Sequence, residues 1–502
     1  MRKSTVFLLV GLIIGSITLQ GCDNTDPVAD AKDFVRKIIV RLRPVRDGDA
    51  YKPIREGRVE LLPLPNGPEL MTWERFNRQR YEWHLKTYVQ NYEKHGHRSV
   101  VWDDEVKLML GKYAVFRRQK TSKAFMQDLL DQVNHILDLG CKDPRIISIK
   151  GIVIYNLQSP VDAAPFLKLG LELLEKSSYP KRYSFFAASH LCYVYGNTTG
   201  SQNPYNTYHR AKMKYLGQAA LDPDYLDGHQ RYYMQDFITV FSNNNCAMPE
   251  DVNLCMDAIT QSEQIDPWIA LVARGFYHVA LAWQYRGNGY AKSVTDENFN
   301  RFKEEISTAR KCLVQAYELH PEYPEAAAKM IGVSMAIPGN VPMRQWFDRS
   351  TKAHFDYLYA YDDLLWALRP RWRGSHVEML KFGIECLNTE RFDTRVPSQF
   401  LVSLFRIGDE LDNWRKPYQW PGIYELIQKY FAGLLNEPKN RDYEAANKSF
   451  YVVVAWAAGH YHDAHRMMQE LGSRFDRQAY SYLKVSEEQV LNDINSGQKE
   501  GK

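Results

Sequence analysis

Most of the chain repeats one pattern of apolar and polar positions. Between residues 161 and 175, apolar or small side chains fall three or four positions apart, which places them on one face of a helix. The segment 308–319 repeats this spacing. Thr72 is suited to capping a helix, and Trp73–Glu93 after it contains no proline or glycine to interrupt one. The pattern predicts a chain that is overwhelmingly helical from about residue 72 onward.

Prolines punctuate this pattern at intervals of 36 to 54 residues, at Pro144, Pro180, Pro223, Pro267 and Pro321. Proline cannot continue a helix, and it disfavours helical geometry in the residue before it. Each interval also contains one polar break of variable length, and without these breaks the intervals shorten to between about 33 and 41 residues. The expected unit is a helix, a variable loop, a second helix and a turn with proline.

Two segments resemble the tetratricopeptide repeat, which has a period of about 34 residues and a proline after its second helix. They are 316–326, with Pro321 at the helix end, and 455–464, which matches the consensus across the turn between the two helices. We therefore expect an all-α fold, an α-solenoid of tetratricopeptide-like helical hairpins over residues 71–485, followed by a polar C-terminal tail over 486–502. The alternative is a non-repetitive all-α domain.

Residues 1–21 have the pattern of a secretion signal. Arg2 and Lys3 precede an apolar run over 6–17 that is short for a membrane span, and Leu19-Gln20-Gly21-Cys22 follows. That ending resembles the lipobox of bacterial lipoprotein precursors, in which cleavage leaves the cysteine first and acyl chains such as palmitate are attached there. The resemblance implies that Cys22 anchors the protein to a membrane of the bacterial cell envelope, on the extracytoplasmic side. The alternative is an ordinary signal peptide or an uncleaved anchor.

Residues 22–70 differ from the helical remainder of the chain. Two short β-like runs, 37–42 and 59–62, lie among several prolines. We interpret this region as a tether with a small irregular or β segment.

Charge and cysteine content narrow the class of protein. The 502-residue chain has 64 basic and 60 acidic side chains and a net charge of +4, which gives no support to nucleic-acid binding. Once Cys22 is lipidated, six of the seven cysteines remain. Cys246 and Cys255 lie close together in a polar stretch, and a disulfide between them would close a small loop.

A second resemblance covers about residues 340–400. The run Arg369-Pro370-Arg371-Trp372-Arg373-Gly374-Ser375 resembles the P-R-W-x-G-S turn of an uncharacterised bacterial family, a domain of unknown function found in exported and lipid-anchored proteins. Arg373 stands where a second glycine is expected. The resemblance implies no known activity.

Three arginines surround an aromatic ring in this turn, an arrangement suited to an anionic ligand and to cation–π stacking. In a solenoid, the turns that join the two helices of each hairpin all lie along one edge. We therefore expect this turn to lie on the same edge as the loops that contain Tyr205 and Tyr290. The candidate binding rim consists of Arg369, Arg371, Trp372, Arg373, Tyr205 and Tyr290.

A structural role for the same turn is the alternative. One of its arginines would pair locally with Asp362 or Asp363, and Trp372 would pack under the turn. Ser375 and Glu378 have the spacing of a helix capping box, which explains the serine without a catalytic role.

The sequence contains little evidence of a metal site or of a catalytic site. The densest group of metal-ligand residue types is His460, His462, Asp463 and His465, of which only two or three share a helix face. The sequence has no nucleotide-binding glycine loop and no H-E-x-x-H motif. It therefore predicts no metal or cofactor, assigns no catalytic residue and favours a non-enzymatic role, while leaving enzymatic activity open.

These features favour a lipid-anchored helical-repeat scaffold that binds a protein or peptide in the cell envelope. The alternative is a glycan-binding or glycan-processing lipoprotein, because SusD-like glycan-capture proteins combine tetratricopeptide helices with exposed aromatic side chains. Aromatic residues make up 13% of this chain. A platform of three or more exposed tryptophan and tyrosine rings would favour glycan binding, whereas scattered buried rings would favour the scaffold.

Overall fold

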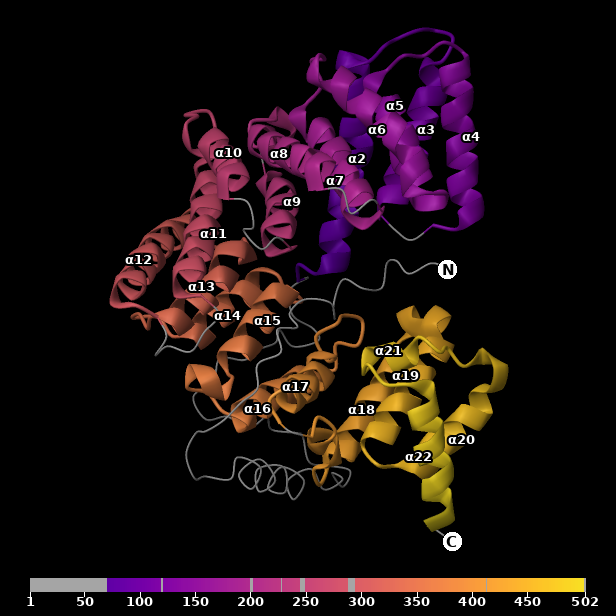
Figure 1. Ribbon diagram of the computed structural model, residues 1–502, viewed down its shortest axis with the longest axis vertical. Helices are drawn as coiled ribbons and strands as arrows, with labels where there is room; N and C mark the ends of the chain where they lie inside the picture. Colours follow the sequence, from indigo (N-terminus) through magenta and orange to yellow (C-terminus); the bar gives the residue numbers. More distant parts are fainter. Residues whose placement is uncertain are drawn as a thin grey trace. The chain divides into compact units, whose positions relative to one another are not determined.

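The computed structural model describes residues 70–118, 121–198, 202–226, 228–243, 249–287, 294–411 and 413–500. Within these ranges the regular elements are helices and no strand occurs, so the fold is all-α as predicted (Figure 1). The small β segment predicted within 22–70 falls on residues outside the described ranges. No helix of the described chain is both long and apolar enough to cross a membrane.

The chain divides into two compact units between Ile337 and Pro338, where the sequence predicts a continuous array. The first unit covers Met71–Ile337. Its elements are α2 (Trp73–His95), α3 (Asp103–Arg118), α4 (Lys123–Asp138), α5 (Pro144–Leu157), α6 (Pro160–Glu175), α7 (Lys181–Thr198), α8 (Gln202–Ala219), η1 (Pro223–Tyr225), α9 (Gln230–Asn243), α10 (Pro249–Thr260), α11 (Pro267–Arg286), α12 (Asp296–Leu319) and α13 (Pro324–Ala336).

Successive helices of this unit pack against one another as in a solenoid. α5 packs along α6, α7 along α8, and α11 along α12, while α6 contacts α7 and α8 contacts α10. These pairs end close to Pro180, Pro223 and Pro321, as the proline spacing predicts. The predicted hairpin of α9 and α10 is more open, because α9 packs on η1 and α11, whereas α10 packs mainly on α8.

Aspartate and proline together set where helices begin. Pro144 and Pro267 occupy the first positions of α5 and α11, where their missing N–H costs nothing. The preceding Asp143 and Asp266 accept hydrogen bonds from main-chain N–H groups of the first turn. Thr72 caps α2 in the same way, as predicted.

Glycines allow close approach between packed helices, both within a pair and between neighbouring pairs. A Cβ added to Gly217 of α8 would lie 2.6 Å from the main-chain oxygen of Cys255 in α10. A Cβ added to Gly170 of α6 would collide with Ser148 of α5. A side chain at either position would therefore force the two helices apart.

The second unit is described from Pro338 to residue 500. Neighbouring helices again pack together, α14 with α15, α16 with α17, and α18 with α19, and the tetratricopeptide-like segment 455–464 spans the turn between α19 and α20. Its elements are α14 (Met343–Ala353), α15 (Leu358–Ala367), η3 (Pro370–Trp372), α16 (His376–Leu387), α17 (Gln399–Gly408), η4 (Lys416–Gln419), α18 (Ile423–Asn436), η5 (Pro438–Tyr443), α19 (Glu444–Ala457), α20 (Tyr461–Leu471), η6 (Gly472–Arg474), α21 (Ala479–Tyr482) and α22 (Glu487–Glu500).

The last helix corrects the prediction of a polar tail over 486–502. α22 packs on α19 and α20. Val490 and Ile494 lie one helical turn apart and are both buried. Between them, Asp493 accepts a hydrogen bond of 3.0 Å from the indole Nε1 of Trp456. Two apolar positions on one face are enough to dock a segment whose overall composition is polar.

Candidate functional site

The turn that carries the predicted arginine cluster is built around a buried carboxylate. Arg369 precedes η3, and its buried guanidinium Nη1 lies 3.4 Å from Oε1 of Glu410. His376, in the first turn of α16, places Nε2 3.2 Å from Oε2 of the same glutamate. Burial lowers the pKa of Arg369 to about 10, and Glu410 opposes this shift. The ion-pair partner is thus a residue that follows α17, and not either of the aspartates upstream that the sequence suggested.

The other predicted side chains of the turn are more accessible. Arg371 is 47% exposed, and its Nε lies 3.6 Å from Oε1 of Glu410. Trp372 is half-buried, with its ring centroid 6.5 Å from that of Trp366. Arg373 is exposed as well, so Arg371, Trp372 and Arg373 are the members of this cluster that a partner could contact, whereas Arg369 is buried.

The backbone of the turn shows which of its positions suit glycine. Arg373 has a φ of 72°, in the left-handed region that glycine adopts without strain. A Cβ added to Gly374 would collide with the main-chain oxygen of Leu368, so the second position of the turn requires glycine. Ser375 then caps α16 by accepting a hydrogen bond from the main-chain N–H of Glu378 at 3.1 Å, as predicted.

The remaining predicted residues are not brought together in the described chain. Tyr205 is half-buried on α8, where its ring lies against Gly196 of α7. Cys255 is buried in α10, and burial raises the pKa of its thiol. Cys22, Cys246 and Tyr290 lie outside the described residues. The common rim, the disulfide and the lipid attachment therefore stay predictions.

A set of residues that the sequence analysis missed lies inside the 71–337 unit. Three alternate helices of the array, α5, α7 and α9, each have a buried arginine as their second residue. Each of these arginines places its guanidinium over an aromatic ring of α2. The pairs are Arg145 with Tyr88 at 4.1 Å, Arg182 with Trp83 at 4.6 Å, and Arg231 with Phe76 at 4.5 Å.

These three contacts hold α2 across the first turns of α5, α7 and α9. A cation over an aromatic face contributes up to about 2 kcal/mol when the pair is removed from water. The segments involved are distant in the sequence, so the contacts join α2 to three later helices of the unit. We call the three pairs the arginine–aromatic clamp.

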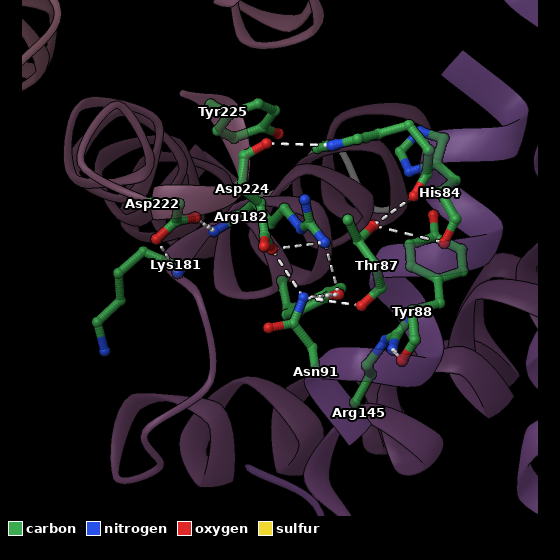
Figure 2. Close-up of polar contacts among 12 residues, drawn as sticks. His84, Thr87, Tyr88, Asn91, Arg145, Lys181, Arg182, Asp222, Asp224 and Tyr225 are labelled. Atoms are coloured by element: carbon green, nitrogen blue, oxygen red, sulfur yellow. Dashed lines mark hydrogen bonds and ion pairs between the residues drawn. The ribbon is translucent and has the colours of Figure 1, made fainter. Parts of the chain in front are cut away.

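The central pair of the clamp carries the densest set of hydrogen bonds (Figure 2). Nη2 of Arg182 lies 2.9 Å from Oδ2 of Asp224 and donates to the hydroxyl of Tyr183 at 2.9 Å. Asn91, one turn beyond Thr87 on α2, donates to the same Asp224 oxygen at 2.7 Å. The side chains of α2, α7 and the η1 turn thus share one buried network.

Arg145 is held differently from its two counterparts. Its guanidinium lies between the rings of Tyr88 and Tyr183, 4.1 and 4.3 Å from their centroids, and Nη1 donates to the main-chain oxygen of Tyr88 at 2.8 Å. Arg231 forms an ion pair with Glu325, with 2.8 Å between Nε and Oε1, and Arg182 forms one with Asp224. No carboxylate of the described residues pairs with Arg145. Its buried Nη2 has no hydrogen-bond acceptor in the described chain, so ring faces are its main neighbours.

The electrostatic consequence is a positive region around His84 of α2. Burial and the nearby charges of Arg80, Arg182, Arg117 and Arg145 hold the pKa of His84 well below its usual value. Arg80 is paired with Asp236 at 2.8 Å. The histidine is therefore neutral at neutral pH, and it adds no further charge to the four arginines.

A buried aspartate completes the network at the start of α7. Asp222 accepts hydrogen bonds from the main-chain N–H groups of Lys181 and Arg182, at 2.9 and 2.8 Å. It therefore caps a helix that begins 41 residues before it. Burial raises its pKa to about 6, with Asp224 adding to the shift and the two N–H groups and Arg182 opposing it.

The histidine-rich segment at 460–465 does not form a metal centre in the described structure. His460 precedes α20 and stacks on Tyr424, with ring centroids 3.4 Å apart. Asp463 accepts a hydrogen bond of 2.8 Å from the hydroxyl of Tyr424 and pairs with Arg466 at 3.1 Å. Throughout the described chain no three side chains of histidine, cysteine, aspartate or glutamate are placed to hold a metal ion.

One sequence signal could have revealed the clamp. A positive charge in the first turn of a helix opposes the helix dipole, and such positions normally favour aspartate or glutamate. Arg145 and Arg182 break this rule at equivalent places, two residues after Asp143 and after Pro180. A repeated local violation indicates a tertiary contact that outweighs it.

No known family model matches the chain, and no curated protein matches it.

The raised pKa of Asp222 predicts a specific dependence of stability on pH. The folded chain binds this proton more tightly than the unfolded chain, so the contribution of Asp222 to the free energy of unfolding is greatest below pH 4 and falls as the pH rises to 6. Relative to Asp222→Asn, the wild-type protein should gain about 2 kcal/mol of stability between pH 7 and pH 4.5. Urea unfolding at each pH measures this difference.

The exposed Asp138 of α4 supplies a control, since Asp138→Asn removes one surface carboxylate and should leave the wild-type pH dependence in place. The raised pKa of Asp222 would be contradicted if the difference in the free energy of unfolding between wild type and Asp222→Asn did not change with pH, or if the advantage of the wild type grew toward neutral pH.

Proposed function

We propose that this protein is a lipid-anchored helical-repeat scaffold that binds a protein or peptide on the extracytoplasmic side of the bacterial cell envelope. The observation that carries the proposal is the packing of successive helix pairs against their neighbours, because solenoids of this kind serve mainly in recognition. The Leu19–Cys22 segment supports the lipid anchor, and the exposed Arg371 beside Trp372 supports a binding role for the turn after α15.

The distribution of aromatic side chains favours the scaffold over glycan capture. Most large rings of the described chain are buried, Trp268 and Trp456 among them. The exposed ones in the described residues are Tyr193, Phe299 and Tyr443, which lie on α7, α12 and η5. Three separate elements do not supply the flat platform of stacked rings that a glycan surface uses.

The anchor predicts the location of the protein. Replacing Cys22 by serine removes the thiol that would carry acyl chains, so the variant should leave the membrane fraction or accumulate as an uncut precursor. Membrane fractionation with immunodetection, and metabolic labelling with palmitate, measure both outcomes. Normal processing together with unchanged membrane retention would contradict lipid attachment.

The binding role predicts capture of an envelope protein by the lipidated chain that begins at Cys22. Arg371→Ala combined with Trp372→Ala should lower capture of that protein at least tenfold, because these two adjacent side chains belong to the accessible part of the arginine turn. Circular dichroism should show unchanged helicity. Affinity purification from solubilised envelopes, with mass spectrometry, measures capture.

A matched control is Arg477→Ala combined with Tyr443→Ala, which removes one exposed arginine and one exposed aromatic ring from the same unit. Capture by this control should equal that by wild type. If wild type captures no envelope protein, the scaffold function is wrong; if the Arg371 and Trp372 variant still captures its partner, the turn is not the binding surface.

A further inference from the structure

The face of α7 that contacts α2 continues beyond the clamp. Tyr183, Phe186, His190 and Tyr193 fall three or four residues apart, which places them along one side of the helix. Tyr183 is buried beside α2, whereas exposure increases along the row until Tyr193, which is 52% exposed. The far part of this row is thus an aromatic surface that α2 leaves accessible.

Side chains from two other helices extend this row. The ring of Tyr155, on α5, meets His190 edge-on at 5.8 Å, and His190 lies 6.3 Å from Tyr193. Arg117, in the last turn of α3, places its guanidinium 5.1 Å from the ring of Phe186. Three helices therefore contribute to one surface that combines aromatic rings with one exposed arginine.

Charge is unbalanced on this side of the unit. Arg80 and Arg182 are each paired with an aspartate, Asp236 and Asp224. No carboxylate of the described residues pairs with Arg117 or with the buried Arg145. Neither arginine thus has a carboxylate within ion-pair distance among the described residues, and Arg117 is at the surface; Asp236, the partner of Arg80, acts on Arg117 only from farther away.

His190 adds a hydrogen-bond acceptor without adding charge. Burial and the charge of Arg117 lower its pKa to about 4, so the ring is neutral at neutral pH. Its Nδ1 lies 2.8 Å from the main-chain oxygen of Phe186 and therefore carries the proton. The other ring nitrogen, Nε2, is left with a free lone pair.

We propose that the surface formed by Arg117, Tyr155, Phe186, His190 and Tyr193 binds an acidic peptide segment of a partner protein. A carboxylate of the peptide pairs with Arg117, and the flanking residues pack on the aromatic row beside α2. The unpaired guanidinium sets the sign of the ligand charge, and the length of the row, from Phe186 to Tyr193, suits an extended chain rather than a small ion. This proposal rests on the proposed scaffold function and names its partner chemistry.

A selection with an unbiased probe tests the proposal. The full-length protein in detergent is panned against a phage library of random dodecapeptides. Selected peptides should be enriched in aspartate and glutamate, and their synthetic forms should bind more weakly as salt is added.

Arg117→Glu should weaken this binding at least tenfold, Arg117→Gln should weaken it less, and Tyr193→Ala should also weaken it. Arg477→Glu makes the same charge change in the other unit and should have no effect.

Peptides without acidic enrichment, or acidic peptides whose affinity is unchanged by Arg117→Glu, would overturn the proposal. The proposal would also be overturned if the surface bound a neutral oligosaccharide mixture and no acidic peptide, and if Tyr193→Ala abolished the binding of the sugar. An envelope partner whose capture survives Arg117→Glu would leave the scaffold function standing and overturn this site alone. Circular dichroism of each variant confirms that the helices are retained.

Discussion

The stacking of buried arginines on the aromatic rings of α2 is the interaction on which the 71–337 unit depends. A solenoid is built from contacts between neighbours, and each helix pair needs only the pairs before and after it. The clamp adds contacts of another kind, because one helix near the start of the chain contacts α5, α7 and α9 through Arg145, Arg182 and Arg231. The clamp therefore connects, through α2, helix pairs that would otherwise contact only their immediate neighbours.

Each arginine is placed against a local electrostatic preference, since it lies in the first turn of a helix. Acids offset this cost at two of the three positions, the partly buried Asp224 for Arg182 and the buried Glu325 for Arg231. Breaking such a buried pair typically costs several kcal/mol, because the remaining charge is left unpaired away from water. At Arg145 the charge faces two tyrosine rings and a main-chain oxygen. The field of this residue therefore remains less compensated than that of the other two.

This arrangement links packing to recognition. α2 covers the part of the α7 face around Tyr183 and leaves the part around Tyr193 accessible. Arg145 of the clamp lies at the covered end of this face, over Tyr183, whereas Arg117 lies over Phe186 and is the arginine whose charge acts on His190 and Tyr193. In the proposed peptide site it is therefore Arg117, and not a clamp arginine, that would set the sign of the ligand charge.

The sequence predicted what depends on local chemistry. The helices, the cap at Thr72, the cap at Ser375 and the helix ends near prolines follow from residue types that act within one turn, and the structure confirms them. Partners across long separations were not predicted. Glu410 could not be identified as the partner of Arg369, and nothing in α2 alone indicated which helices its rings would meet. The docking of α22 was missed because its described buried side chains are only two, Val490 and Ile494, and because the partner of Asp493, Trp456, is distant in the sequence.

Hydrogen exchange of α2 tests the clamp most directly. In Arg182→Met the central stack on Trp83 and the pair with Asp224 are removed while most of the side-chain volume stays. Exchange followed by mass spectrometry on the full-length protein should show amides of Trp73–His95 exchanging at least tenfold faster than in wild type, with α12 unchanged. Unchanged exchange in α2, or equal acceleration in α2 and α12, would contradict the claim that the arginines hold this helix in place.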